Sequence, residues 1–183
     1  MKALKAFFAA LLLISMFFGG YFYMEKRAEK ERSTIEHAIG FIPAQVDVGE
    51  PFILGNGGDF IDCNNMFYSF WLSETALAAI HDKKLAYFDD ALRGRMTERP
   101  HGYTEAPVIY SKWKETPTNE YFMPIAGEIS CTSDMLDPEL KAKIAKALRS
   151  HGSYYAIGEY LRSVHLMLVV LPELKIVMVG YDK

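Results

Sequence analysis

The chain has 183 residues, of which half are apolar and 14% aromatic, and its net charge is −3. This composition excludes an intrinsically disordered chain, because such chains lack the apolar surface to form a core. Two of the basic residues, Lys2 and Lys5, lie at the N-terminus, and the part from Glu25 onward carries 18 basic and 23 acidic residues. This acidic excess argues against nucleic-acid binding, which needs a basic surface.

Residues 6–24, AFFAALLLISMFFGGYFYM, contain no charged side chain. A helix of this length rises about 28 Å, close to the thickness of about 30 Å of a bilayer's hydrocarbon core. Lys2 and Lys5 precede the run, whereas acids and bases cancel after it, so the positive-inside rule places the N-terminus in the cytoplasm. We therefore expect residues 1–24 to form a single-pass anchor in the inner (cytoplasmic) membrane, with the rest of the chain periplasmic or otherwise extracytoplasmic.

Two alternatives to this anchor are a cleaved signal peptide and a buried soluble helix. The first lacks a good cleavage site, because a cut after Gly19 or Gly20 places Phe17 or Phe18 where a small residue is needed. Ser15 and Gly19 are spaced as in close-packed membrane helices, which leaves a homodimer through the anchor open.

The chain has two cysteines, Cys63 and Cys131, and no C-x-x-C motif. In an oxidising compartment an isolated pair of cysteines indicates one disulfide bond. The alternatives are two buried free thiols, or cysteines too far apart to join. We expect no metal and no cofactor, since no metal-ligand spacing or nucleotide-binding motif occurs.

Residues 25–37 are rich in helix-forming charged residues and lack an apolar stripe, so we expect a charged helical stalk that ends near Gly40. Residues 38–183 are then expected to form one extracytoplasmic α+β domain. Ser73 is suited to cap a helix whose apolar residues recur as far as Leu92, with a break near residues 82–84. Gly94 is expected to cap the end of this helix.

The second half of the domain is predicted to be mostly strand. Residues 108–114 are expected to form a hairpin with residues 121–125, and residues 128–131 to extend the sheet. A helix is predicted to follow Asp137 and Pro138. Three C-terminal strands are predicted at residues 154–161, 164–171 and 175–181, of which the second is apolar enough to be central. The predicted fold is α+β, with a transmembrane helix and one mainly antiparallel sheet packed by two principal helices.

Arg93, Arg95, Arg99 and His101 fall within nine residues and form the most distinctive candidate binding site. Arginines presented together can grip a carboxylate or a phosphate. The alternative is a solvated loop whose arginines pair with nearby acids such as Glu98.

No catalytic motif occurs in the sequence, so an enzyme is the less favoured interpretation. We expect a membrane-anchored extracytoplasmic protein that binds another envelope protein as an accessory subunit or an inhibitor. One alternative is a small hydrolase that combines His101 or His165 with Asp59 or Glu128. The other is a domain that binds or senses an anionic ligand through the arginine cluster.

Overall fold

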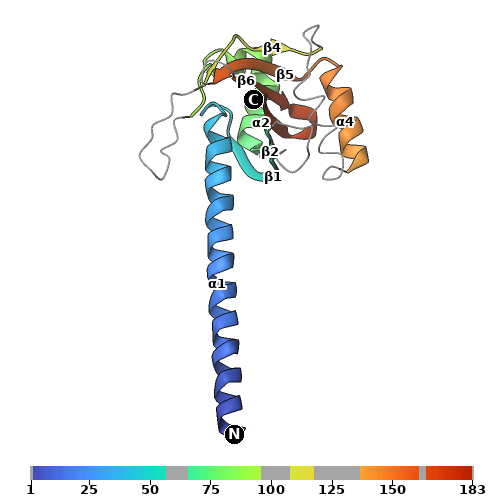
Figure 1. Ribbon diagram of the computed structural model, residues 1–183. Coiled ribbons are helices and arrows are strands. Elements are labelled where there is room, and N and C mark those ends of the chain that lie inside the picture. The colour runs from blue at the N-terminus through green and yellow to red at the C-terminus, as the bar shows by residue number, and fades with distance from the viewer. Residues whose placement is uncertain (1, 57–65, 96–107, 118–136, 161–163, 183) are drawn as a thin grey trace. The chain divides into compact units, whose positions relative to one another are not determined.

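The computed structural model describes residues 2–56, 66–95, 108–117, 137–160 and 164–182 (Figure 1). Some side chains within the helices and strands lie outside this description, namely those of residues 2–14, 53–56, 66–67, 160, 164–165 and 181–182. The chain divides into two compact units, Met1–Glu36 and His37–Lys183.

Residues 2–36 of the first unit are helical, since α1 extends over Lys2–Gly40 and includes the first four residues of the second unit. The large apolar side chains between Met16 and Met24 are all exposed, with exposed fractions between 56% and 74%. The helix continues through the charged residues 25–36, as their helix propensity predicts. Among the residues that the structure describes, no helix combines the length and the apolar character needed to cross a membrane.

The second unit contains one antiparallel sheet. Its strands are β1 (Val48–Asn56), β2 (Met66–Leu72), β3 (Ile109–Tyr110), β4 (Lys114–Glu115), β5 (Tyr154–Tyr160), β6 (Val164–Leu171) and β7 (Ile176–Asp182). The strands lie in the order β1-β2-β7-β6-β5-β3, and β4 pairs with the same strand, β5. Every strand pair in the described part of the chain is antiparallel. This confirms the predicted α+β fold with one antiparallel sheet.

Helix α4 (Pro138–Leu148) covers one face of the sheet, and Figure 1 shows it in orange beside the red C-terminal strands. Its first turn is capped as predicted, because the Asp137 side chain accepts a 3.2 Å hydrogen bond from the Leu140 amide. The buried Ile144 of α4 packs in a cluster with sheet residues: Tyr155, Met167, Val169, Leu171, Ile176 and Met178. Full burial of side chains of this size contributes about 1.5–3 kcal/mol each.

The opposite face is covered by α2 (Glu74–Lys83) and the following 3-10 helix η2 (Lys84–Phe88). The ring of Phe88 lies 5.0 Å from that of Tyr154, whereas the next residue, Tyr155, belongs to the cluster under α4. Successive side chains of a strand point to opposite faces, so β5 is buried on both. The same holds for β6, which is buried throughout residues 166–171. The prediction of a central apolar strand is therefore confirmed.

The sheet is strongly curled. At its β3 edge, Gly94 forms a bridge with Pro43, and at its other edge β1 begins at Val48. Five residue steps from Pro43 to Val48 cover at most about 18 Å. The path across the sheet leads from Pro43 to residues 93–94, then to β3, and on through β5, β6, β7 and β2 to β1. These seven steps between neighbouring segments would cover about 34 Å if the sheet were flat. Only a curled sheet brings its two edges within reach of this short connection.

The first domain helix breaks near residues 82–84 as predicted, whereas its predicted end at Gly94 is wrong. Ser73 caps α2 as expected, by accepting a 3.1 Å hydrogen bond from the Ala76 amide. The α-helix ends at Lys83, because Lys84 has a positive φ of 50°. The apolar spacing continues because η2 still buries Phe88. Gly94 is not a helix cap but part of an extended segment that bridges to Pro43.

The hairpin predicted between residues 108–114 and 121–125 stays a prediction, but the structure shows how its first half pairs. Strands β3 and β4 both pair with β5 and not with each other. The expected return strand at residues 121–125 lies outside the described residues, as do residues 128–131. The C-terminal hairpin agrees with the prediction, since β6 pairs with β7 across the short helix η3 (Pro172–Leu174).

Candidate functional site

Two segments far apart in the sequence, residues 41–46 and 92–95, extend the sheet beyond β3, and we call them the seam. The Gly94 amide donates a 2.9 Å hydrogen bond to the Val108 carbonyl oxygen. The Arg95 amide donates one of 3.2 Å to the Ile42 carbonyl oxygen. Residues 92–95 therefore lie between β3 and the segment that follows α1.

Gly94 is needed for this close approach. A Cβ atom at this position would lie 2.6 Å from the carbonyl oxygen of Gly40 and 3.1 Å from that of Phe41. Both neighbours are backbone atoms, which cannot move aside as a flexible side chain can. The seam therefore requires glycine at position 94 for space.

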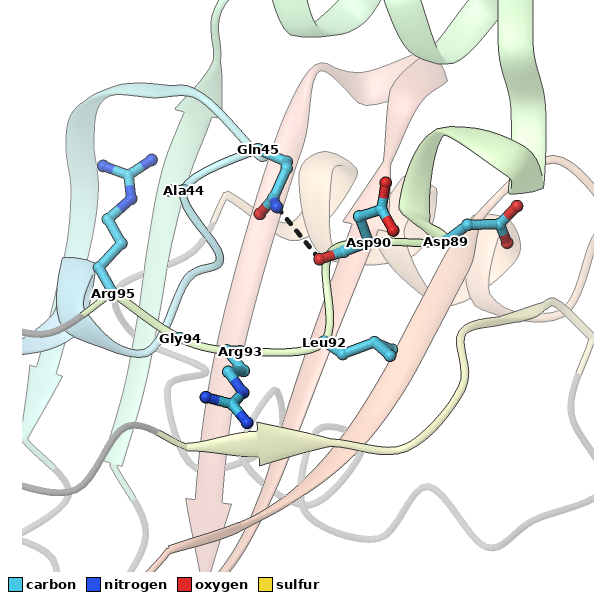
Figure 2. A pocket seen from close by; sticks show the side chains of 8 residues that line it. All are labelled: Ala44, Gln45, Asp89, Asp90, Leu92, Arg93, Gly94 and Arg95. Atoms are coloured by element: carbon cyan, nitrogen blue, oxygen red, sulfur yellow. Dashed lines mark hydrogen bonds between the residues drawn. The ribbon is translucent and has the colours of Figure 1, made fainter.

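An open pocket of about 510 Å³ lies on the seam. Its lining residues come from both segments and from the end of η2: Ala44, Gln45, Asp89, Asp90, Leu92, Arg93, Gly94 and Arg95 (Figure 2). The Gln45 amide group donates a 3.1 Å hydrogen bond to the Asp90 carbonyl oxygen, and the Tyr87 hydroxyl donates one to the Gln45 carbonyl oxygen. These bonds join the two walls, so the pocket is formed before any ligand arrives.

Arg95 serves the seam itself. Its Nη2 atom donates a 2.9 Å hydrogen bond to the carbonyl oxygen of Val46. Its Nε atom is buried and has no hydrogen-bond partner within the described part of the chain. A guanidinium group that bonds to a main-chain carbonyl fixes the local backbone, and fewer of its donors remain for a ligand.

Arg93 is exposed, and its guanidinium group points away from that of Arg95 in Figure 2. The two groups therefore do not form a joint grip on one anion. Asp89 and Asp90 are also exposed, and their carboxylates point in different directions in the same view. The pocket thus presents separate charges of both signs, which suits contact with a polar protein surface more than acid–base catalysis.

Several residues singled out from the sequence lie outside the described residues. Arg99 and His101, the second half of the arginine cluster, are among them, as are Cys63 and Cys131. The disulfide bond therefore stays a prediction. Of the residues considered for a hydrolase, Asp59 and Glu128 also lie outside, and His165 is described only by its backbone in β6. Within the described ranges, no group of three or more His, Cys, Asp or Glu residues could hold a metal ion.

Sequence reasoning missed Gln45, Asp90 and Leu92 as neighbours of Arg93. They lie beside it only because residues 41–46 return to residues 92–95, some fifty positions later in the chain. No local pattern signals such a pairing. The glycine at position 94 was a usable signal, but it fits a helix cap equally well in the sequence.

Comparison of the chain with protein-family models, with curated proteins and with solved structures finds no match in any of the three.

Proposed function

We propose that this protein is tethered to a membrane by residues 6–24 and acts by binding another protein on the extracytoplasmic side. The observation that carries the proposal is the exposure of every large apolar side chain from Met16 to Met24. Successive residues of a helix are rotated by about 100°, so these side chains cover all sides of α1. A helix that is apolar all round is stable when it is surrounded by lipid or by protein.

The sequence of the tether supports the membrane as this environment. Its uncharged run extends nine residues before Ser15, although the structure describes the side chains only from Ser15 onward. Tyr21 and Tyr23 stand near its end, where interfacial aromatic residues are common, and charged residues follow at once. The lysines at positions 2 and 5 favour a cytoplasmic N-terminus. In that orientation the domain is exported, and Cys63 and Cys131 are in a compartment where they can form a disulfide bond.

A binding role is supported by Trp71, whose side chain is 44% exposed on β2. Its ring stacks on that of Phe52 with a centroid distance of 4.4 Å. This stack holds the indole in one orientation, so little side-chain entropy is lost when a partner covers it. Tryptophan is also among the residues that most often dominate the binding energy of protein interfaces.

Membrane extraction tests the tether. The full chain is expected to stay in the membrane pellet after washing with alkaline carbonate. Replacing both Met16 and Phe17 with lysine should move it to the soluble fraction, because lysine near the centre of a membrane helix costs about 2.5–3.5 kcal/mol. Lysine replacements of Glu29 and Glu36 serve as a control and should leave the chain in the pellet. Release of the unaltered chain by carbonate would refute the tether.

Topology and binding need separate experiments. A reporter that is active only outside the cytoplasm, fused after Lys183, should be active, and activity of a cytosolic reporter there would refute export. Cross-linking in cells should recover another protein with the tethered chain. Trp71→Ala should lower that recovery about tenfold or more, the loss typical of a hot-spot residue. Lys112→Ala, at an exposed position, is the control. Recovery of the chain alone would contradict the binding role.

A further inference from the structure

Three residues on adjacent segments, Arg93, Ile109 and Glu159, lie side by side on one face of the sheet, and we call them the outer row. Arg93 pairs with Ile109, and Ile109 pairs with Glu159. The amides of Gly94 and Tyr110 bond to the carbonyl oxygens of Val108 and Leu92 respectively. These bonds flank the pair of Arg93 with Ile109, which makes it a non-hydrogen-bonded pair, the type whose side chains are closest.

The outer row lies on the face that α4 covers elsewhere. Along β5, side chains alternate between faces, so Glu159 points to the same side as Tyr155, which packs under α4. Glu159 is four residues further along the strand, or about 13 Å from Tyr155. The opposite face at this point is filled, since a Cβ atom at Gly158 would lie 2.7 Å from the Val108 side chain.

The outer row is open to solvent. Ile109 is 60% exposed, which is a large apolar exposure for a residue in a sheet. Arg93 and Glu159 are exposed as well. Neither charged side chain forms an ion pair or hydrogen bond with another described residue. The row thus presents a positive charge, an apolar side chain and a negative charge in a line of about 10 Å, since paired strands lie about 4.8 Å apart.

This order of charges is self-complementary. In a twofold-symmetric interface, if residue i contacts residue j of the other copy, then residue j contacts residue i. With the axis at Ile109, the arginine of each copy faces the glutamate of the other, and the two isoleucines meet in the middle. We propose that the protein forms a homodimer in which the outer rows of two copies pack against each other in this way.

In this arrangement the contact between Arg93 of one copy and Glu159 of the other occurs twice, so every charged side chain of the two outer rows is paired. The two exposed Ile109 side chains are covered as well. Its strength in the cell rests partly on the proposed tether, because confinement of two copies to one membrane raises their effective concentration. The interface itself involves only residues of the folded domain.

Charge reversal tests the pairing in full-length chains that carry two different epitope tags and are co-expressed and solubilised in mild detergent. The unaltered copies should co-precipitate. Arg93→Glu, introduced in both copies, places a glutamate opposite Glu159 at each of the two contacts. Glu159→Arg, introduced in both copies, places an arginine opposite Arg93 at each contact. Each is expected to reduce co-precipitation about tenfold or more, since opposed like charges at an interface are strongly unfavourable.

Two combinations should restore the dimer. One copy with Arg93→Glu and the other with Glu159→Arg should co-precipitate again, because both contacts then join opposite charges. The double variant with both substitutions should likewise pair with itself. Arg149→Glu and Glu173→Arg, at exposed positions outside the row, are the charge-matched controls and should have no effect.

The outcomes separate the dimer from the tether. Each variant is also fractionated, and a chain that leaves the membrane fails the tether and not the interface. Unchanged co-precipitation of both single variants would overturn the proposed dimer. Loss in both single variants without restoration in the mixed pair would also overturn it, since the two residues would then not face each other.

Discussion

The Tyr110 hydroxyl donates a 2.7 Å hydrogen bond to the backbone carbonyl oxygen of Phe41, 69 positions earlier in the chain. Tyr110 lies in β3 and Phe41 follows α1 directly, so this bond joins the edge of the sheet to the segment where the domain begins. Both residues are buried. The bond therefore contributes to the seam on which the pocket and Arg93 depend.

Replacing Tyr110 with phenylalanine removes this bond and keeps the ring in place. We expect the free energy of unfolding to fall by about 1–2 kcal/mol, the usual cost of losing a buried hydrogen bond. Tyr87→Phe is the matched control, because the Tyr87 hydroxyl also bonds to a backbone carbonyl but at an exposed site. Water can replace that bond, so its loss should cost less. Denaturant unfolding of both variants measures the difference, and equal losses would contradict the role given to burial.

Tyr110 also makes stability depend on alkaline pH. Burial raises the pKa of Tyr110 above the ordinary tyrosine value of about 10. Well below pH 10, the Tyr110 hydroxyl is therefore neutral in both the folded and the unfolded chain, and its contribution to stability is fully present. As the pH rises above 10, the unfolded chain loses the proton first, and the free energy of unfolding falls by about 1.4 kcal/mol per pH unit.

Tyr110→Phe should reduce the fall in the free energy of unfolding above pH 10 by about 1.4 kcal/mol per pH unit. Burial also raises the pKa of Tyr154, with a further contribution from Glu115, so some slope should remain in the variant. Unfolding measured between pH 9 and 11 gives the comparison. An identical slope in the variant would show that Tyr110 ionises equally in both states.

Two crowded glycines should tolerate alanine poorly. A Cβ atom at Gly94 would meet backbone oxygen at 2.6 Å, and one at Gly158 would meet the side chains of Val108 and Tyr110 at 2.7 and 2.9 Å. Overpacking costs about 1–3 kcal/mol, and we expect Gly94→Ala at the upper end because backbone cannot rotate away. Gly49→Ala is the control, since the nearest atom there is 3.8 Å away. Thermal unfolding ranks the three, and a control as damaging as Gly94→Ala would refute this account.

The parts of the fold that depend on neighbouring residues could be predicted from the sequence. Ser73 and Asp137 cap helices because their short polar side chains reach backbone amides three residues ahead. The apolar run of β6 indicates a strand buried on both faces. These features need no information from elsewhere in the chain.

The seam could not be predicted, because it joins residues about fifty and seventy positions apart. The apolar spacing through Phe88 and Leu92 fits a helix that continues, and only Lys84, with its positive φ, interrupts it. Gly94 fits a helix cap and a crowded strand equally well. The sequence also places Arg93 and Arg95 together, but the carbonyl oxygen of Val46 draws Arg95 away from its neighbour. That carbonyl oxygen is available only once residues 41–46 have packed against the seam.

The two arginines should therefore respond differently to substitution. Arg95→Ala removes the hydrogen bond to Val46 and is expected to lower the free energy of unfolding by about 1–3 kcal/mol. Arg95→Lys should restore only part of this, because an ammonium group lacks the geometry of the guanidinium fork. Arg93→Ala is expected to change the free energy of unfolding by less than about 0.5 kcal/mol, as substitutions at most exposed positions do. Chemical denaturation gives all three values at a protein concentration where the chain is monomeric.

Titration with inorganic phosphate distinguishes this structural role from the anion grip that the sequence also allows. If Arg95 holds the seam, phosphate should bind the unaltered chain and the folded Arg95→Ala variant equally weakly. An Arg95→Ala variant with unchanged stability and lost phosphate binding would show instead that the guanidinium serves a ligand. The hydrogen bond to Val46 favours the first result, because breaking it to reach an anion in the open pocket would cost about as much as the new contact returns.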